Sequence, residues 1–141
     1  MTTTYLWNPP PVHSLPVRGR AERLPINRLF FVGRNYHAHA IEMARPVDKA
    51  VDKPFYFTKA PGTLVESGAT VAYPPETANY HFEMELVLAV GKAGFRVAEA
   101  DAAAIVYGYA CGLDMTRRDL QLVARDKGRP WDLGKDVEQS S

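Results

Sequence analysis

The sequence is poor in the features that mark several large classes of protein. It has one cysteine, Cys111, in 141 residues, which excludes an intramolecular disulfide framework and a zinc site built from several thiolates. No apolar run approaches the length of about 20 residues that crosses a bilayer. The formal net charge is +1, and no Lys and Arg cluster resembles a nucleic-acid-binding stripe. The first residues also lack the basic and apolar segments of a secretory signal. We therefore expect a cytoplasmic protein that binds neither membranes nor nucleic acid.

Sequence signatures of organic cofactors and of serine nucleophiles are missing as well. The segment 91–94 lacks the spacing of a phosphate-binding loop or a dinucleotide fingerprint, and no Gly-x-Ser-x-Gly elbow occurs. Cys111 lies in an apolar run, so we expect a buried and inert thiol. The remaining composition, 46% hydrophobic and 23% charged, is typical of a globular domain.

Proline and hydrophobic periodicity divide the chain into two parts. Residues 1–27 are rich in proline and predict an extended arm, whereas residues 28–141 predict one folded domain. The expected strands are 29–32, 55–59, 70–73, 81–90 and 107–113, and the expected helices are 35–44, 98–106 and 117–127. This order predicts an α+β protein with a mixed β-roll or barrel-like fold and short helices. No closing element follows residue 135, which suggests that the C-terminal portion of the fold is lacking.

Two glutamates stand on one face of an expected strand. Apolar and polar residues alternate around Glu83 and Glu85, and residues two apart in a strand project to the same side. Adjacent carboxylates repel each other, and a hard divalent cation bound between them would offset this repulsion. Asp114, which follows the next buried strand, would be a third oxygen ligand. Three carboxylates without a nearby cysteine favour Mg²⁺, Mn²⁺ or Ca²⁺ over Zn²⁺. The competing interpretation places both glutamates on a solvated face.

A histidine and a glutamate lie three residues apart on an expected helix. His39 and Glu42 share one face of that helix, and a carboxylate beside an imidazole can make it a general base for water. His37 lies on nearly the opposite face, and spacing does not choose between the two histidines. A solvated His/Glu pair is the alternative.

Further polar residues follow the expected strand ends and helix starts. Thr116 begins a Thr-Arg-Arg-Asp segment that predicts a capping box, with its hydroxyl at the helix N-terminus. The other candidates are Lys59, Arg118, Gln121 and Lys135. Each of these four is by default a surface residue.

These residues together resemble the fumarylacetoacetate hydrolase family, most closely its fumarylpyruvate hydrolase (acylpyruvase) branch. The resemblance runs in order over about residues 28–135. The motifs are Gly33-Arg34-Asn35-Tyr36-x-x-His39-x-x-Glu42-Met43, His81-x-Glu83-x-Glu85-Leu86, Leu113-Asp114-Met115-Thr116-x-Arg118-Asp119-x-Gln121, and Gly128-x-Pro130-Trp131 followed by Lys135.

The resemblance implies roles for the candidate residues. Glu83, Glu85 and Asp114 would hold the metal, and His39, Glu42 and Lys135 would be catalytic. The implied substrate-binding residues are Arg34, Tyr36, Lys59, Arg118 and Gln121. The family implies a homodimer and a small 2-oxo acid substrate.

The expected activity is hydrolysis of a C–C bond in an acylpyruvate, namely fumarylpyruvate, in the breakdown of aromatic compounds. Two alternatives stay open at this point. The same metal site would serve an oxaloacetate decarboxylase or a 2-oxo acid isomerase, and the chain would be an inactive fragment if it needs a partner segment.

Overall fold

The computed structural model describes residues 3–43 and 47–141, and the side chain of Glu42 lies outside this description. Its elements in chain order are β1 (Ser14–Pro16), β2 (Arg23–Pro25), β3 (Leu29–Gly33), α1 (His37–Glu42), β4 (Phe55–Lys59), the 3₁₀ helix η1 (Pro61–Thr63), β5 (Tyr80–His81), β6 (Met84–Val90), the 3₁₀ helix η2 (Glu99–Ile105), β7 (Val106–Leu113), β8 (Thr116–Arg117), α2 (Arg118–Asp126) and α3 (Asp132–Lys135).

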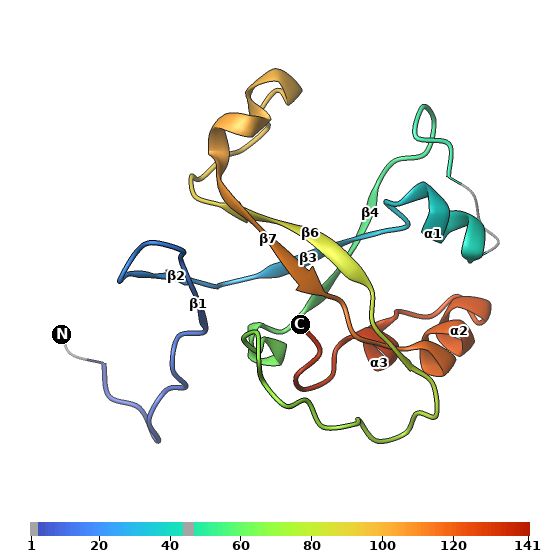
Figure 1. The fold of residues 1–141 in the computed structure, drawn as a ribbon, viewed down its shortest axis with the longest axis horizontal. Coiled ribbons are helices and arrows are strands. Elements are labelled where there is room, and N and C mark those ends of the chain that lie inside the picture. The colour runs from blue at the N-terminus through green and yellow to red at the C-terminus, as the bar shows by residue number, and fades with distance from the viewer. Residues whose placement is uncertain (1–2, 44–46) are drawn as a thin grey trace.

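The strands of the described residues form antiparallel pairs, β1 with β2, β3 with β4, β5 with β8 and β6 with β7. In Figure 1 the long hairpin β6–β7 crosses the pair β3–β4 near the centre, with α2 and α3 beyond one end of the crossing. The expected mixture of strands and short helices is confirmed. The described strands do not close into a barrel.

The strands 29–32, 55–59 and 107–113 lie where their sequence pattern predicts them, but the predicted strand 81–90 is divided into β5 and β6 because Phe82 and Glu83 belong to neither. The predicted strand 70–73 does not form in the described residues. The aromatic strand β4 matches the predicted range 55–59, and β7 delivers Asp114 directly after its last residue. The predicted helix at 98–106 is a 3₁₀ helix instead. The capping prediction is wrong, because Thr116 belongs to β8 and α2 begins at Arg118 without a side-chain cap.

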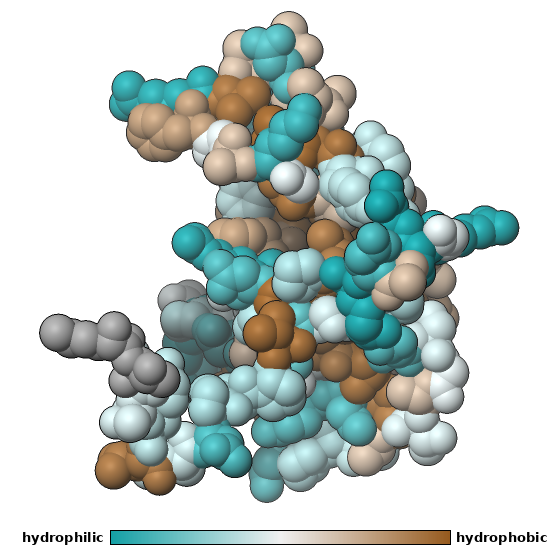
Figure 2. All heavy atoms as spheres, turned by 90° about the vertical axis from the view of Figure 1, so that its left-hand side faces the viewer, coloured by the Kyte–Doolittle hydropathy of each residue, from teal (hydrophilic) through white to brown (hydrophobic). Residues whose placement is uncertain are grey.

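Much apolar surface of the described chain is uncovered. The buried hydrophobic residues are Ala40, Ala124 and Val137, whereas β6 and β7 present exposed side chains at Met84, Leu86, Leu88, Val90, Tyr107 and Tyr109. Figure 2 shows hydrophobic atoms running from the protruding hairpin toward the middle of one face. Cys111 is also exposed on β7, so the prediction of a buried thiol is wrong. No helix of the described residues is long and apolar enough to cross a membrane.

Candidate active site

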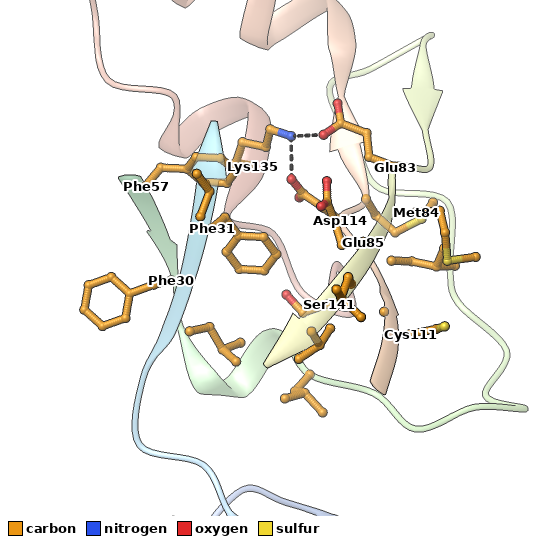
Figure 3. A pocket seen from close by; sticks show the side chains of 18 of the residues that line it. Phe30, Phe31, Phe57, Glu83, Met84, Glu85, Cys111, Asp114, Lys135 and Ser141 are labelled. Carbon is orange, nitrogen blue, oxygen red and sulfur yellow. Dashed lines mark hydrogen bonds and ion pairs between the residues drawn. The ribbon is translucent and has the colours of Figure 1, made fainter. Parts of the chain in front are cut away.

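The register of β6 with β7 brings the acidic residues together. Met84 pairs with Leu113, and the backbones of Glu83 and Asp114 exchange two hydrogen bonds of 3.2 and 2.8 Å just beyond that pair. Glu85 lies opposite Gly112, one step further along β6. Figure 3 shows the carboxylates of Glu83, Glu85 and Asp114 near one another at one end of a cavity. Glu83 and Glu85 are both half-buried and separated by an exposed Met84, so they share a face as the alternation predicts.

Lys135 joins two of these carboxylates. Its ammonium lies 2.7 Å from Glu83 Oε2, Asp114 Oδ2 and Thr116 Oγ1. An ammonium has three N–H donors, so these contacts use all of them. The side chain is 1% exposed, and it reaches the cluster because the short helix α3 ends at Lys135 beside β4 and β8. The sequence assigned Thr116 to a cap, whereas the structure uses its hydroxyl to orient this lysine.

Lys59 approaches the other oxygen of Asp114. The Nζ atom lies 2.8 Å from Asp114 Oδ1, but it donates hydrogen bonds to Met115 O, Ser140 O and Ser140 Oγ at 3.0, 2.7 and 3.1 Å. Lys59 therefore joins Asp114 to the backbone of Met115 and to Ser140 near residue 141. Burial lowers the pKa of Lys59, and the charge of Asp114 offsets part of that effect.

Glu83 is surrounded by cations. Its Oε1 lies 2.5 Å from Arg118 and 3.8 Å from His39 Nε2, and Arg118 also donates to Gln121 Oε1 at 2.5 Å. Burial on its own would raise the pKa of Glu83, but Lys135 and Arg118 together outweigh it and hold this pKa below its ordinary value. Arg118 and Gln121 are both buried, so the first turn of α2 faces the carboxylates.

Glu85 experiences the opposite balance of charges. Burial raises its pKa first, and the charges of Asp114 and Glu83 raise it further. Lys135 and His39 oppose this effect without cancelling it. Glu85 therefore holds its proton more tightly than a free glutamate. Burial and its acidic neighbours raise its pKa, whereas Lys135 forms its short ion pairs with Glu83 and Asp114.

Helix α1 carries the two histidines in different surroundings. His39 is half-buried and lines the cavity, whereas His37 is exposed and does not. The hydroxyl of Tyr36, directly before α1, accepts a hydrogen bond of 3.0 Å from Leu86 N–H in β6. Arg34 lines the cavity and stacks over the Phe55 ring at 5.3 Å. The proposed partnership of His39 with Glu42 falls outside the described side chains and stays a prediction.

The cavity has a volume of about 1410 Å³ and lies between the β3–β4 and β6–β7 pairs. One wall is aromatic, with Phe31 stacked on Phe57 at 5.2 Å. Lys135 stands 4.9 Å from the centre of the Phe57 ring, and Lys59 stands 5.2 Å from that of Phe31. The two rings and Ser140 contribute to the site, but the sequence alone did not single them out. An aromatic strand is ordinarily a packing element, and a serine near residue 141 is ordinarily exposed to solvent.

The residues present suit a divalent cation. Glu83, Glu85 and Asp114 lie near one another (Figure 3), and burial together with the charges of Asp114 and Glu83 raises the pKa of Glu85. Hard oxygen donors of this kind are what Mg²⁺, Mn²⁺ and Ca²⁺ prefer. In the described residues Lys135 supplies the positive charge, and no three His, Cys, Asp or Glu side chains are yet arranged around one ion position.

The two strand pairs enclose a cavity with an acidic, lysine-bridged cluster at one end, and comparison with known proteins gives the family. Residues 28–141 match the model of the fumarylacetoacetate (FAA) hydrolase C-terminal domain. The chain therefore belongs to the fumarylacetoacetate hydrolase family, as its motifs predict.

Individual relatives refine this placement. A fumarylpyruvate hydrolase from Ralstonia is 76% identical over 99 residues, which are 70% of this chain and 52% of the relative. An oxaloacetate tautomerase from Caenorhabditis elegans is 36% identical over 113 residues, 80% of this chain and 51% of the relative. The crystal structure of a Pseudomonas aeruginosa fumarylpyruvate hydrolase with Mn²⁺ and pyruvate superposes with a TM-score of 0.89 at 45% identity, covering 97% of this chain and 60% of that one. The chain thus spans about half the length of the curated relatives it matches.

Proposed function

We propose that the chain carries the site of a divalent-metal-dependent hydrolase that cleaves fumarylpyruvate into fumarate and pyruvate. The observation that carries this proposal is the convergence of Glu83, Glu85 and Asp114 with the ammonium of Lys135 at one end of the cavity. The Ralstonia relative named fumarylpyruvate hydrolase and the P. aeruginosa structure with Mn²⁺ and pyruvate support the same reaction.

Glu83, Glu85 and Asp114 would hold the metal, which we propose to be Mg²⁺, with Mn²⁺ or Ca²⁺ as alternatives. When bound, the cation would act as a Lewis acid toward the 2-oxo acid end of the substrate. Arg118 and Gln121 lie beside these carboxylates and are placed to bind the substrate carboxylate and oxo groups. Arg34 and Tyr36 line the cavity from the side of α1, where the acyl end would lie.

His39 is the proposed general base. It lines the cavity 3.8 Å from Glu83 Oε1, and Glu42 would orient it. The imidazole takes a proton from water, and the resulting hydroxide adds to the distal ketone carbon. The C–C bond then breaks, its electron pair leaves on pyruvate as an enolate, and fumarate departs. Protonation of the enolate carbon completes the addition of one water across the bond.

The buried lysines would stabilise the charge that develops during cleavage. Lys135 and Lys59 place two ammonium groups on opposite oxygens of Asp114. Fixed cations in a largely buried site lower the energy of a developing oxyanion more than mobile solvent does. This accounts for two lysines that are 1% and 3% exposed in one site.

A second reaction is favoured by a specific observation, the oxaloacetate tautomerase relatives at 36% to 41% identity. Enolisation of a 2-oxo acid would use the same donors and the same lysines without attack by water. Decarboxylation of oxaloacetate would also pass through an enolate. We further propose a cytoplasmic homodimer, which the exposed apolar face of β6 and β7 supports as a surface for a second copy.

The test follows the absorbance of fumarylpyruvate with the 141-residue chain in Mg²⁺ or Mn²⁺, and again after a chelator. We expect metal-dependent loss of substrate with fumarate and pyruvate in equal amounts. His39→Ala should slow turnover by about 10²- to 10⁴-fold, and Glu83→Ala should abolish the response to metal, while the exposed Glu22→Ala serves as the matched control. Carbon dioxide from oxaloacetate, or tautomerisation without cleavage, would replace the hydrolase by one of the alternative reactions.

A further inference from the structure

The helix that carries His39 is short and begins without a capping side chain. Helix α1 is six residues long, with no side-chain cap at its N-terminus, and a helix of this length is unstable unless tertiary contacts fix it. Ala40 is fully buried, but Ile41 is 56% exposed. The approach to α1 is also strained, because Arg34 has a φ of 56° in the left-handed region.

One hydrogen bond links this helix directly to the strand that carries Glu85. Tyr36 is the residue immediately before α1, and its carbonyl accepts the first helical bond from Ala40 N–H at 3.0 Å. Its side-chain hydroxyl accepts Leu86 N–H at 3.0 Å. Leu86 directly follows Glu85 in β6, so the bond connects the start of α1 to the backbone that places the carboxylates.

The bond also satisfies a group that would otherwise lack a partner. Edge strands present unpaired N–H groups, and β6 is paired with β7 on one side in the described residues. The Tyr36 ring lines the cavity and is 41% exposed, so packing alone does not fix it. An accepting hydroxyl keeps its own O–H free to donate, which leaves the predicted contact with substrate possible.

We propose that Tyr36 is a positioning residue whose bond to Leu86 sets the distance between the His39 imidazole and the carboxylates of Glu83 and Glu85. Through the first turn of α1, the bond places His39 Nε2 3.8 Å from Glu83 Oε1. The catalytic part of this inference rests on the proposed function, whereas the mechanical part concerns this chain alone. Displacing a general base by about 1 Å lowers turnover by as much as about 10²-fold.

The structural test is amide hydrogen exchange at Leu86, measured by NMR on the 141-residue chain. Tyr36→Phe keeps the ring and removes the acceptor, so exchange at Leu86 should accelerate by about tenfold, and the His39 ring resonances should shift. Tyr109→Phe is the matched control, because Tyr109 is 67% exposed on β7 and lies outside the cavity lining. Unchanged exchange at Leu86 in Tyr36→Phe would overturn the proposal.

The kinetic test separates positioning from substrate binding. Tyr36→Phe should lower kcat by about tenfold with KM within about twofold, and it should have no further effect in a His39→Ala background, because residues that act through one another are not additive. A raised KM with unchanged kcat would make Tyr36 a substrate-binding residue instead. If the wild-type chain cleaves no fumarylpyruvate, the proposed function fails, and the exchange and resonance measurements still decide the link between Tyr36 and His39.

Discussion

Replacing Glu85 by glutamine should stabilise the metal-free chain while removing its response to metal. The substitution keeps the shape of the side chain and deletes its charge. Burial and the charges of Asp114 and Glu83 raise the pKa of Glu85 in the folded state, so the folded chain binds the Glu85 proton more tightly than the unfolded chain does. Stability therefore falls as pH rises from the ordinary pKa to the raised one, and the full penalty is present above the raised pKa.

The size of the gain follows from the charges around the site. Lys135 makes its short ion pairs with Glu83 and Asp114, so Glu85 carries the unbalanced repulsion. Unfavourable pairs of neighbouring side chains on a sheet cost about 0.2–1 kcal/mol. We therefore expect Glu85→Gln to raise the free energy of unfolding by about 0.5–1 kcal/mol at pH 7, and to give no gain below pH 4, where glutamate is protonated in both states.

With a divalent cation bound, we expect the wild-type chain to be more stable than Glu85→Gln. An ion at about 100 times its Kd stabilises the folded state by about 2.7 kcal/mol, and the variant lacks one of the three proposed carboxylate ligands. Urea denaturation at pH 7 and pH 4, with and without Mg²⁺ or Mn²⁺, measures both effects. The control is Glu22→Gln, an exposed residue between β1 and β2. A variant less stable than wild type at pH 7 without metal, or a difference that does not change with pH, would refute the reasoning.

Two further predictions concern the lysine and a close contact beside it. Lys135→Met should cost about 1–3 kcal/mol in urea denaturation, because it removes the ammonium that bridges Glu83 and Asp114, which keep Arg118 and Lys59 as their remaining cations. The exposed Lys92→Met should change little, and a loss below about 1 kcal/mol for Lys135→Met would show that the bridging ion pairs contribute little to folding. Gly134→Ala should cost about 1–3 kcal/mol, since a Cβ there would lie 2.8 Å from the Gln121 backbone nitrogen. Gly108→Ala, which meets open space, is its control, and equal thermal midpoints for the two variants would contradict the packing of α3 on α2.

Local sequence pattern predicted the shared face of the two glutamates and the end of β7, although Glu83 lies just before β6 and not within it. The period-two alternation places Glu83 and Glu85 on one face, and β7 ends directly before Asp114. Strand periodicity depends on neighbouring residues alone, so it can be read without knowing the fold. The family motifs predicted the same residues and the family itself.

Predictions from local sequence pattern were wrong for two residues whose surroundings depend on segments far along the chain. Thr116 has the sequence of a helix cap, but its hydroxyl contacts Lys135, 19 residues away. Cys111 and its apolar neighbours suggest burial, yet no described element covers that face of β7. Neither outcome depends on the residues beside Thr116 or Cys111.

By itself the sequence determined the family, the shared face of the two glutamates, and the set of acidic and basic residues available for chemistry. The tertiary structure decided how those charges are matched. It placed Lys135 between Glu83 and Asp114, gave Lys59 to the other oxygen of Asp114, and left the pKa of Glu85 raised. The reason is that Coulomb interactions depend on distance in space, and the distance from Lys59 to Asp114 is fixed only when β4 and β7 pack around one cavity.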